Sequence, residues 1–189
     1  MKTCLRICLV AALGLLAAGC GGVTLIDPAK PQVIGDMTVM PQIQWNQFPG
    51  DPKVWTVNGP NLDSLRFFAG VKSGQPLMTP FGVKKDQMAV FDAKMLPNDV
   101  QDLVVGTLEK VGYQNVRPGN LAPCPFGSAT GFCFDLAFTS ADGLEMKGLV
   151  TASKKDATLD LVEFVAPSEY YYGELSPTVS KVFASIQTK

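Results

Sequence analysis

Histidine is absent from this chain of 189 residues. Serine and cysteine nucleophiles are most often activated by a histidine, and most zinc and haem sites use one as a ligand. A glycine-rich phosphate-binding loop is also missing. Residues 127–131 superficially resemble one, but no lysine and no helix follows them. We therefore expect no metal and no cofactor, and we expect residues 127–131 to be a hairpin tip.

A strong excess of charge of one sign is missing as well. The chain has 16 basic and 17 acidic residues, spread along its length, which excludes a nucleic-acid-binding surface. Two carboxylates could still serve a glycosidase. Asp135, Glu145 and Glu163 are the candidates, but each sits among polar alternates of an expected strand. We expect them on the solvated surface, and a carboxylate-dependent hydrolase is the least favoured function.

The N-terminal segment has the features of a secretory signal. Lys2 and Arg6 precede an apolar run over residues 7–18, which is too short to cross a bilayer. The run ends in Leu-Ala-Ala-Gly-Cys at residues 16–20, which resembles the lipobox of bacterial lipoproteins. The resemblance implies cleavage after residue 19, a diacylglycerol on the thiol of Cys20, and a further fatty acid such as palmitate on the new amino terminus. The alternative is an ordinary secretory signal that happens to contain a cysteine.

Two or three acyl chains would hold the protein permanently on a membrane, whereas one chain binds reversibly. An aspartate at position 21 would resemble an inner-membrane retention signal, but this chain has Gly21. We therefore expect the outer membrane and its periplasmic face, with the cell surface as the alternative. Removing Lys2 and Arg6 with the signal leaves 14 basic against 17 acidic residues, a net charge of −3. We expect a flexible tether over residues 20–32 and a single domain over residues 33–189.

The remaining cysteines indicate a disulfide. Cys4 and Cys8 leave with the signal, so only Cys124 and Cys133 stay in an oxidising compartment. A zinc site is the alternative, but two thiols without histidine supply only half of its ligands.

The first half of the domain contains β-forming segments. We expect strands within residues 37–48, broken near Pro41, and at residues 54–57. Residues 62–71 fit a strand or a helix; we favour a strand that returns as a hairpin at residues 77–78. A further strand is expected at residues 86–91. Apolar residues then recur every three or four positions between Asn98, a candidate cap, and Gly112, which predicts a helix over residues 98–111.

The second half predicts an antiparallel meander. A brief strand at residues 113–116 precedes a Pro/Gly-rich loop at residues 117–132. Strict alternation then predicts a strand over residues 132–138, and turns separate it from strands at residues 144–151 and 159–165. A last helix is expected from Ser176 with Pro177 in its first turn. The fold class is therefore α+β, a meander sheet packed against two helices.

The order of these elements resembles the PsbP-like proteins, which include photosystem accessory subunits, a nuclear-import cofactor and DcrB-type bacterial lipoproteins. The resemblance covers the helix at 98–111, the meander at 132–165 and the ending at 170–186, about half of the chain. It implies a sandwich fold and a non-catalytic accessory or binding role.

Two features suggest contact with a partner. The loop before residue 132 is long, closed by the expected disulfide, and displays Arg117, Asn120 and Phe126. Three consecutive tyrosines cannot all lie on one buried face. They are Tyr170, Tyr171 and Tyr172. We expect an anchored, non-enzymatic module that binds another envelope protein; binding of a small molecule or glycan is the alternative.

Overall fold

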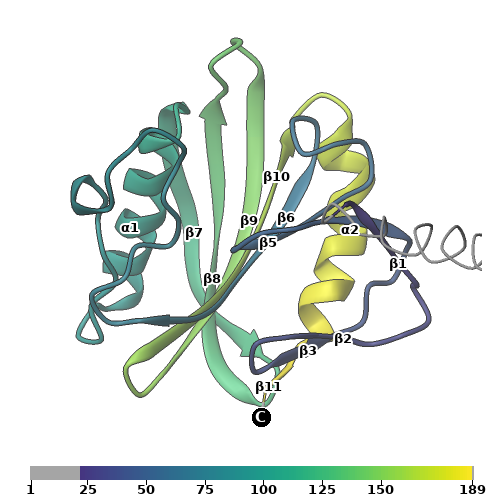
Figure 1. Cartoon of the computed structure of the whole chain (residues 1–189), viewed down its shortest axis with the longest axis horizontal. Helices are drawn as coiled ribbons and strands as arrows, with labels where there is room; N and C mark the ends of the chain where they lie inside the picture. The colour runs from purple at the N-terminus through teal and green to yellow at the C-terminus, as the bar shows by residue number, and fades with distance from the viewer. Residues whose placement is uncertain (1–21, 189) are drawn as a thin grey trace, which may run out of the picture.

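The computed structural model describes residues 22–188 and contains two sheets and two long helices (Figure 1). The N-terminal half supplies β1 (Thr24–Ile26), β2 (Gln32–Ile34), β3 (Met37–Val39), β4 (Trp45–Phe48), β5 (Lys53–Thr56), β6 (Ser64–Lys72) and the 3-10 turn η1 (Lys85–Gln87). The C-terminal half supplies α1 (Pro97–Lys110), β7 (Gln114–Phe126), β8 (Ala129–Thr139), β9 (Glu145–Lys155), β10 (Thr158–Pro167), α2 (Tyr171–Ala184) and β11 (Gln187–Thr188).

The main sheet has eight antiparallel strands in the order β1-β4-β5-β6-β10-β9-β8-β7. A small sheet, β11-β3-β2, joins the end of the chain to its beginning. Figure 1 shows α1 and α2 on either side of the main sheet. This is the α+β class and the meander sheet with two helices that the sequence predicts.

Each face of the main sheet carries its own hydrophobic core. On β10, Leu161 and Val165 belong to the core under α1, whereas Val162 and Phe164 belong to the core under α2. This alternation follows from the period of two along a strand. Because both faces are covered, β10 is apolar on both sides and is almost entirely buried.

The strand β8 confirms the sequence pattern. Its alternate residues Phe132, Phe134, Leu136 and Phe138 are all buried in the α1-side core. The residues between them therefore point to the α2 side. The helix α1 also lies where its apolar stripe predicts, but it begins one residue early. Leu96 caps it, with its backbone N–H donating to Asp99 Oδ2 at 2.7 Å, so the predicted cap at Asn98 is wrong.

The predicted loop at residues 117–132 is instead the long edge strand β7, paired with β8. The prolines in this segment led to the prediction of a loop. Pro118, Pro123 and Pro125 lack a backbone donor, but an edge strand needs no donor on its open side. Two bulges interrupt the pairing. Of the predicted hairpin tip at residues 127–131, only residues 127 and 128 form the turn, because β8 begins at Ala129; Gly127 packs against the backbone of residues 186–188.

Three other boundaries differ from the expectations. Helix α2 begins at Tyr171, not Ser176, and continues through Pro177, because Tyr171 and Tyr172 pack against the α2-side core. Residues 77–78 and 86–91 form no strand. The predicted hairpin partner of β6 is not needed, because β6 pairs with β5 on one side and with β10 on the other. This irregular segment covers the α1-side core with Leu77 and Phe91.

The predicted tether over residues 20–32 is shorter than expected. Residues 24–26 form the edge strand β1, which pairs with β4 and buries Ile26 in the α2-side core. The predicted signal and Cys20 lie outside the described residues.

Candidate functional site

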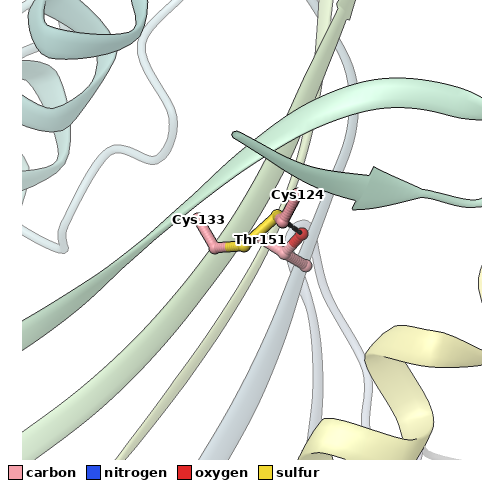
Figure 2. Close-up of a disulfide and its surroundings, with 3 residues drawn as sticks. All are labelled: Cys124, Cys133 and Thr151. Atoms are coloured by element: carbon pink, nitrogen blue, oxygen red, sulfur yellow. Dashed lines mark hydrogen bonds between the residues drawn. A yellow bond between two sulfur atoms is a disulfide. The ribbon is translucent and has the colours of Figure 1, made fainter. Parts of the chain in front are cut away.

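The predicted disulfide joins Cys124 on β7 to Cys133 on β8, with their Cα atoms 5.9 Å apart (Figure 2). Cys133 lies between Phe132 and Phe134, which face α1, so the bridge is on the α2 side of the sheet. The hydroxyl of Thr151 on β9 lies 3.7 Å from Cys124 Sγ. The bridge fixes β7, an edge strand with two bulges, to the neighbouring strand β8.

A groove of about 360 Å³ lies on the same side of the sheet. Its floor includes Ala137 on β8, which is exposed and lies between the α1-facing residues Leu136 and Phe138. We call this site the α2-side groove and define it by its polar and floor residues: Arg117, Asn120, Asp135, Ala137, Lys147 and Tyr172. Strands β7, β8 and β9 and the first turn of α2 each contribute to it.

A β-bulge positions the rim of the groove. Regular pairing of β7 with β8 breaks between Gly119 and Ala122, and Asn120 within this bulge has a φ of 53°. Asparagine tolerates that left-handed conformation better than most residues. The bulge directs the Asn120 side chain onto Asp135, and Asn120 Nδ2 donates a hydrogen bond to Asp135 Oδ2 at 2.6 Å. Bulges are frequent next to functional sites because they re-aim side chains in this way.

Tyr172 forms the wall opposite the bulge. Its ring stacks on Phe164 at 6.1 Å between centroids, and Lys147 Nζ lies 5.7 Å from the ring centroid. Burial, and to a smaller extent the charge of Asp135, raises the pKa of the Tyr172 hydroxyl. The hydroxyl is therefore protonated at neutral pH and can donate a hydrogen bond into the groove.

The groove presents charged groups that can bind a polar ligand. Arg117 and Lys147 are exposed cations that can hold a carboxylate or a carbonyl oxygen. Asp135 already accepts from Asn120. The fold brings Arg117 and Asn120, predicted on the loop before residue 132, together with Tyr172, predicted on the separate tyrosine run.

The other predicted contact residues lie elsewhere. Phe126 is completely buried in the α2-side core, so its predicted display on a loop is wrong. Its ring belongs to the same core as Val179 and Val182 of α2. Tyr170 is 62% exposed, outside the groove, and its ring meets that of Tyr171 edge to face at 5.3 Å. Tyr171 is half-buried against the core.

Glu163 also departs from the expectation of a solvated surface carboxylate. Its side chain is buried on the α1 side, where Arg66 of β6 donates to its Oε2 at 2.9 Å. Burial raises the pKa of Glu163, although the neighbouring Arg66 charge opposes that shift. Arg66 also contacts the Tyr113 hydroxyl at 3.4 Å. The pair lies beneath a smaller cavity of about 260 Å³.

Sequence reasoning missed Lys147 as a residue of the groove. The sequence pattern could have identified it, because Lys147 alternates with buried neighbours on a strand and must face the same side as Asp135.

Among residues 22–188, no cluster of three or more carboxylates or thiols could hold a metal ion. Within that same range no helix is long and apolar enough to cross a membrane.

Comparisons with known proteins identify the fold. No protein-family model matches the chain, and no curated protein matches it. The structure is similar to that of cyanobacterial PsbP (CyanoP) from Synechocystis sp. PCC 6803, with a TM-score of 0.54 and 11% identity, over 92% of this chain and 96% of that one. LpqN, involved in cell envelope biogenesis of Mycobacterium tuberculosis, aligns over 92% of this chain and 88% of its own with 13% identity and a TM-score of 0.39. The first likeness confirms the PsbP-like fold and, at this identity, nothing about function.

Proposed function

We propose that this chain is a lipid-anchored, non-enzymatic module of the cell envelope that binds another envelope protein through the α2-side groove. The observation that supports the proposal most is the meeting of Arg117, Lys147 and Tyr172 around one open cavity. Arginine and tyrosine are enriched at the centres of protein interfaces, where they combine contact area with directed hydrogen bonds.

The groove is also rigid, which favours recognition. Five of its six defining residues come from the paired strands β7, β8 and β9, the disulfide fixes the edge strand β7, and Tyr172 is held by its stack on Phe164. A site whose side chains are already ordered loses less entropy when a partner binds.

The envelope location rests on two features of the chain. The lipobox at residues 16–20 implies a diacylglycerol on Cys20, and Gly21 favours the outer membrane with the domain on its periplasmic side. The bridge between Cys124 and Cys133 fits an oxidising compartment outside the cytoplasm.

A small molecule or glycan is the second candidate occupant. A volume of about 360 Å³ is at the lower end of the range for small-ligand sites. Native mass spectrometry of the protein purified from its membrane tests this alternative, because a bound molecule adds a defined mass that disappears in the Tyr172→Ala variant.

The protein-binding function is tested by co-isolation from detergent-solubilised membranes. The variant Arg117→Ala/Lys147→Ala removes both groove cations, and each lost hot-spot contact costs about 1–2 kcal/mol or more, so recovery should fall at least tenfold. The matched control, Lys110→Ala, removes an exposed cation on α1 and should change nothing. Equal recovery of every partner by all three proteins would overturn the proposal.

A further inference from the structure

The described chain begins at one edge of the main sheet, and the groove lies toward the other edge. Strand β1 is one edge and β7 is the other, with six strands between them. Figure 1 shows β1 and β7 on opposite sides of the molecule. Neighbouring strands lie about 4.8 Å apart, so the groove on β7, β8 and β9 is five to seven spacings from β1, or about 24–34 Å measured along the sheet.

Only a few residues connect the lipid site to β1. Cys20 precedes Thr24, the first residue of β1, by four positions. A fully extended chain covers at most about 3.6 Å per residue, which limits the distance between these two Cα atoms to about 14 Å. A lipid on Cys20 therefore holds the β1 edge next to the membrane surface, whatever path the connecting residues take.

The β1 edge exposes apolar side chains, as a surface next to a membrane should. Val23 is 51% exposed and Leu25 is 59% exposed, although both are large and apolar. Single exposed apolar residues are common, but here two of them lie next to the anchor. Strands β1 and β4 contain no charged residue, so nothing on them repels a lipid headgroup.

The first two charged residues after β1 form an ion pair. Lys30 Nζ lies 3.3 Å from Asp27 Oδ2, and both side chains are exposed just after β1. An anionic bilayer therefore meets an edge that is neutral overall. The short length of β1 also leaves few unpaired backbone groups to be satisfied by headgroups or water.

We infer that the β1 edge, with Val23 and Leu25, rests against the lipid surface of the membrane that holds Cys20. The sheet then stands away from the membrane and presents the α2-side groove on the strands farthest from it. This inference rests on the proposed lipidation of Cys20. It identifies lipid as the partner of the β1 edge. In this orientation the groove faces away from the membrane, where it can meet soluble or envelope-spanning proteins.

Two exposed leucines on opposite edge strands provide a matched test. Leu25 lies on β1 and Leu121 on β7. Leu25→Cys and Leu121→Cys are each labelled with the fluorophore NBD in the full lipidated protein. The labelled proteins are reconstituted into vesicles of phosphatidylethanolamine and phosphatidylglycerol, with or without bromine on the acyl chains.

The label at residue 25 should shift its emission to the blue and be quenched by the brominated lipid, because an interfacial group enters about 5–10 Å into the headgroup boundary. The label at residue 121 should retain its emission in water and escape quenching. Equal behaviour of the two labels would overturn the inference.

Partitioning into detergent, measured on the same samples, separates the two failures. A protein that stays in the aqueous phase would show that Cys20 carries no lipid, which contradicts the anchor itself. A protein that partitions into detergent, but whose label at residue 25 remains unquenched, would contradict only the docking of the β1 edge.

Discussion

Removal of the disulfide should lower the stability of the domain without changing its fold. Cys124 and Cys133 are nine positions apart, so the bridge closes a loop of ten residues. In the chain-entropy model, closing such a loop in the unfolded state contributes about 2.7 kcal/mol. The hydrogen-bonded pairing of β7 with β8 extends beyond the bridge on both sides, so the native strands should remain paired in the variant.

A loss of this size is easily measured. For a domain of this length, 1 kcal/mol corresponds to about 2–4 °C in Tm, which predicts a decrease of about 5–10 °C. The assay is differential scanning calorimetry of the Cys20→Ser form, compared with the same protein carrying Cys124→Ala/Cys133→Ala. Circular dichroism of both should be the same at 25 °C.

The reductant dithiothreitol supplies the control. It should lower the Tm of the form with both cysteines to near that of the Cys124→Ala/Cys133→Ala variant and leave the variant itself unchanged. If the reduced, the oxidised and the substituted proteins all melted within about 1 °C of each other, the reasoning from loop closure would be refuted.

Three further predictions concern stability. Phe126→Ala should cost about 3–5 kcal/mol in the free energy of unfolding by urea, because the ring is fully buried, whereas exposed Leu121→Ala should cost less than about 1 kcal/mol; equal costs would contradict the assignment of β7. Gly131→Ala should lower Tm, because its Cβ would lie 2.5 Å from the carbonyl oxygen of residue 152 and 2.8 Å from Phe126 Cβ; an unchanged Tm would contradict this close packing. Burial raises the pKa of Glu163 in the folded protein above its ordinary value of 4.5, so its contribution to stability is full below that pH and declines as the pH rises through the raised value. Glu163→Gln should lack this decline, and urea titrations of both proteins between about pH 4 and 8 measure the difference; parallel curves would contradict it.

Local periodicity explains what could be predicted. The alternation of Phe132 to Phe138 identified β8, and the stripe of apolar residues after Asn98 identified α1, because each pattern is set by the geometry of its own element. The pairing of Cys124 with Cys133 followed from the signal and the cysteine count alone.

Tertiary context explains what could not be predicted. Proline normally argues against a strand, but Pro118 and Pro123 lie on an edge strand, which no local pattern reveals. Arg66 and Glu163 are 97 positions apart and meet only because β6 pairs with β10. Local patterns likewise identified the loop with Arg117 and Asn120 and the tyrosine run with Tyr172 as two features and could not show that they share one cavity.

Photo-crosslinking in intact cells tests the central claim most directly. A photoreactive amino acid at Ala137 would sit on the groove floor without altering Arg117, Lys147 or Tyr172, and the same group at Glu109 on α1 serves as the control on the opposite face. The account predicts one discrete crosslinked envelope protein from position 137 and none from position 109. Crosslinking that is equal at both positions, or absent at position 137 while the protein remains in the membrane, would contradict a partner-binding groove.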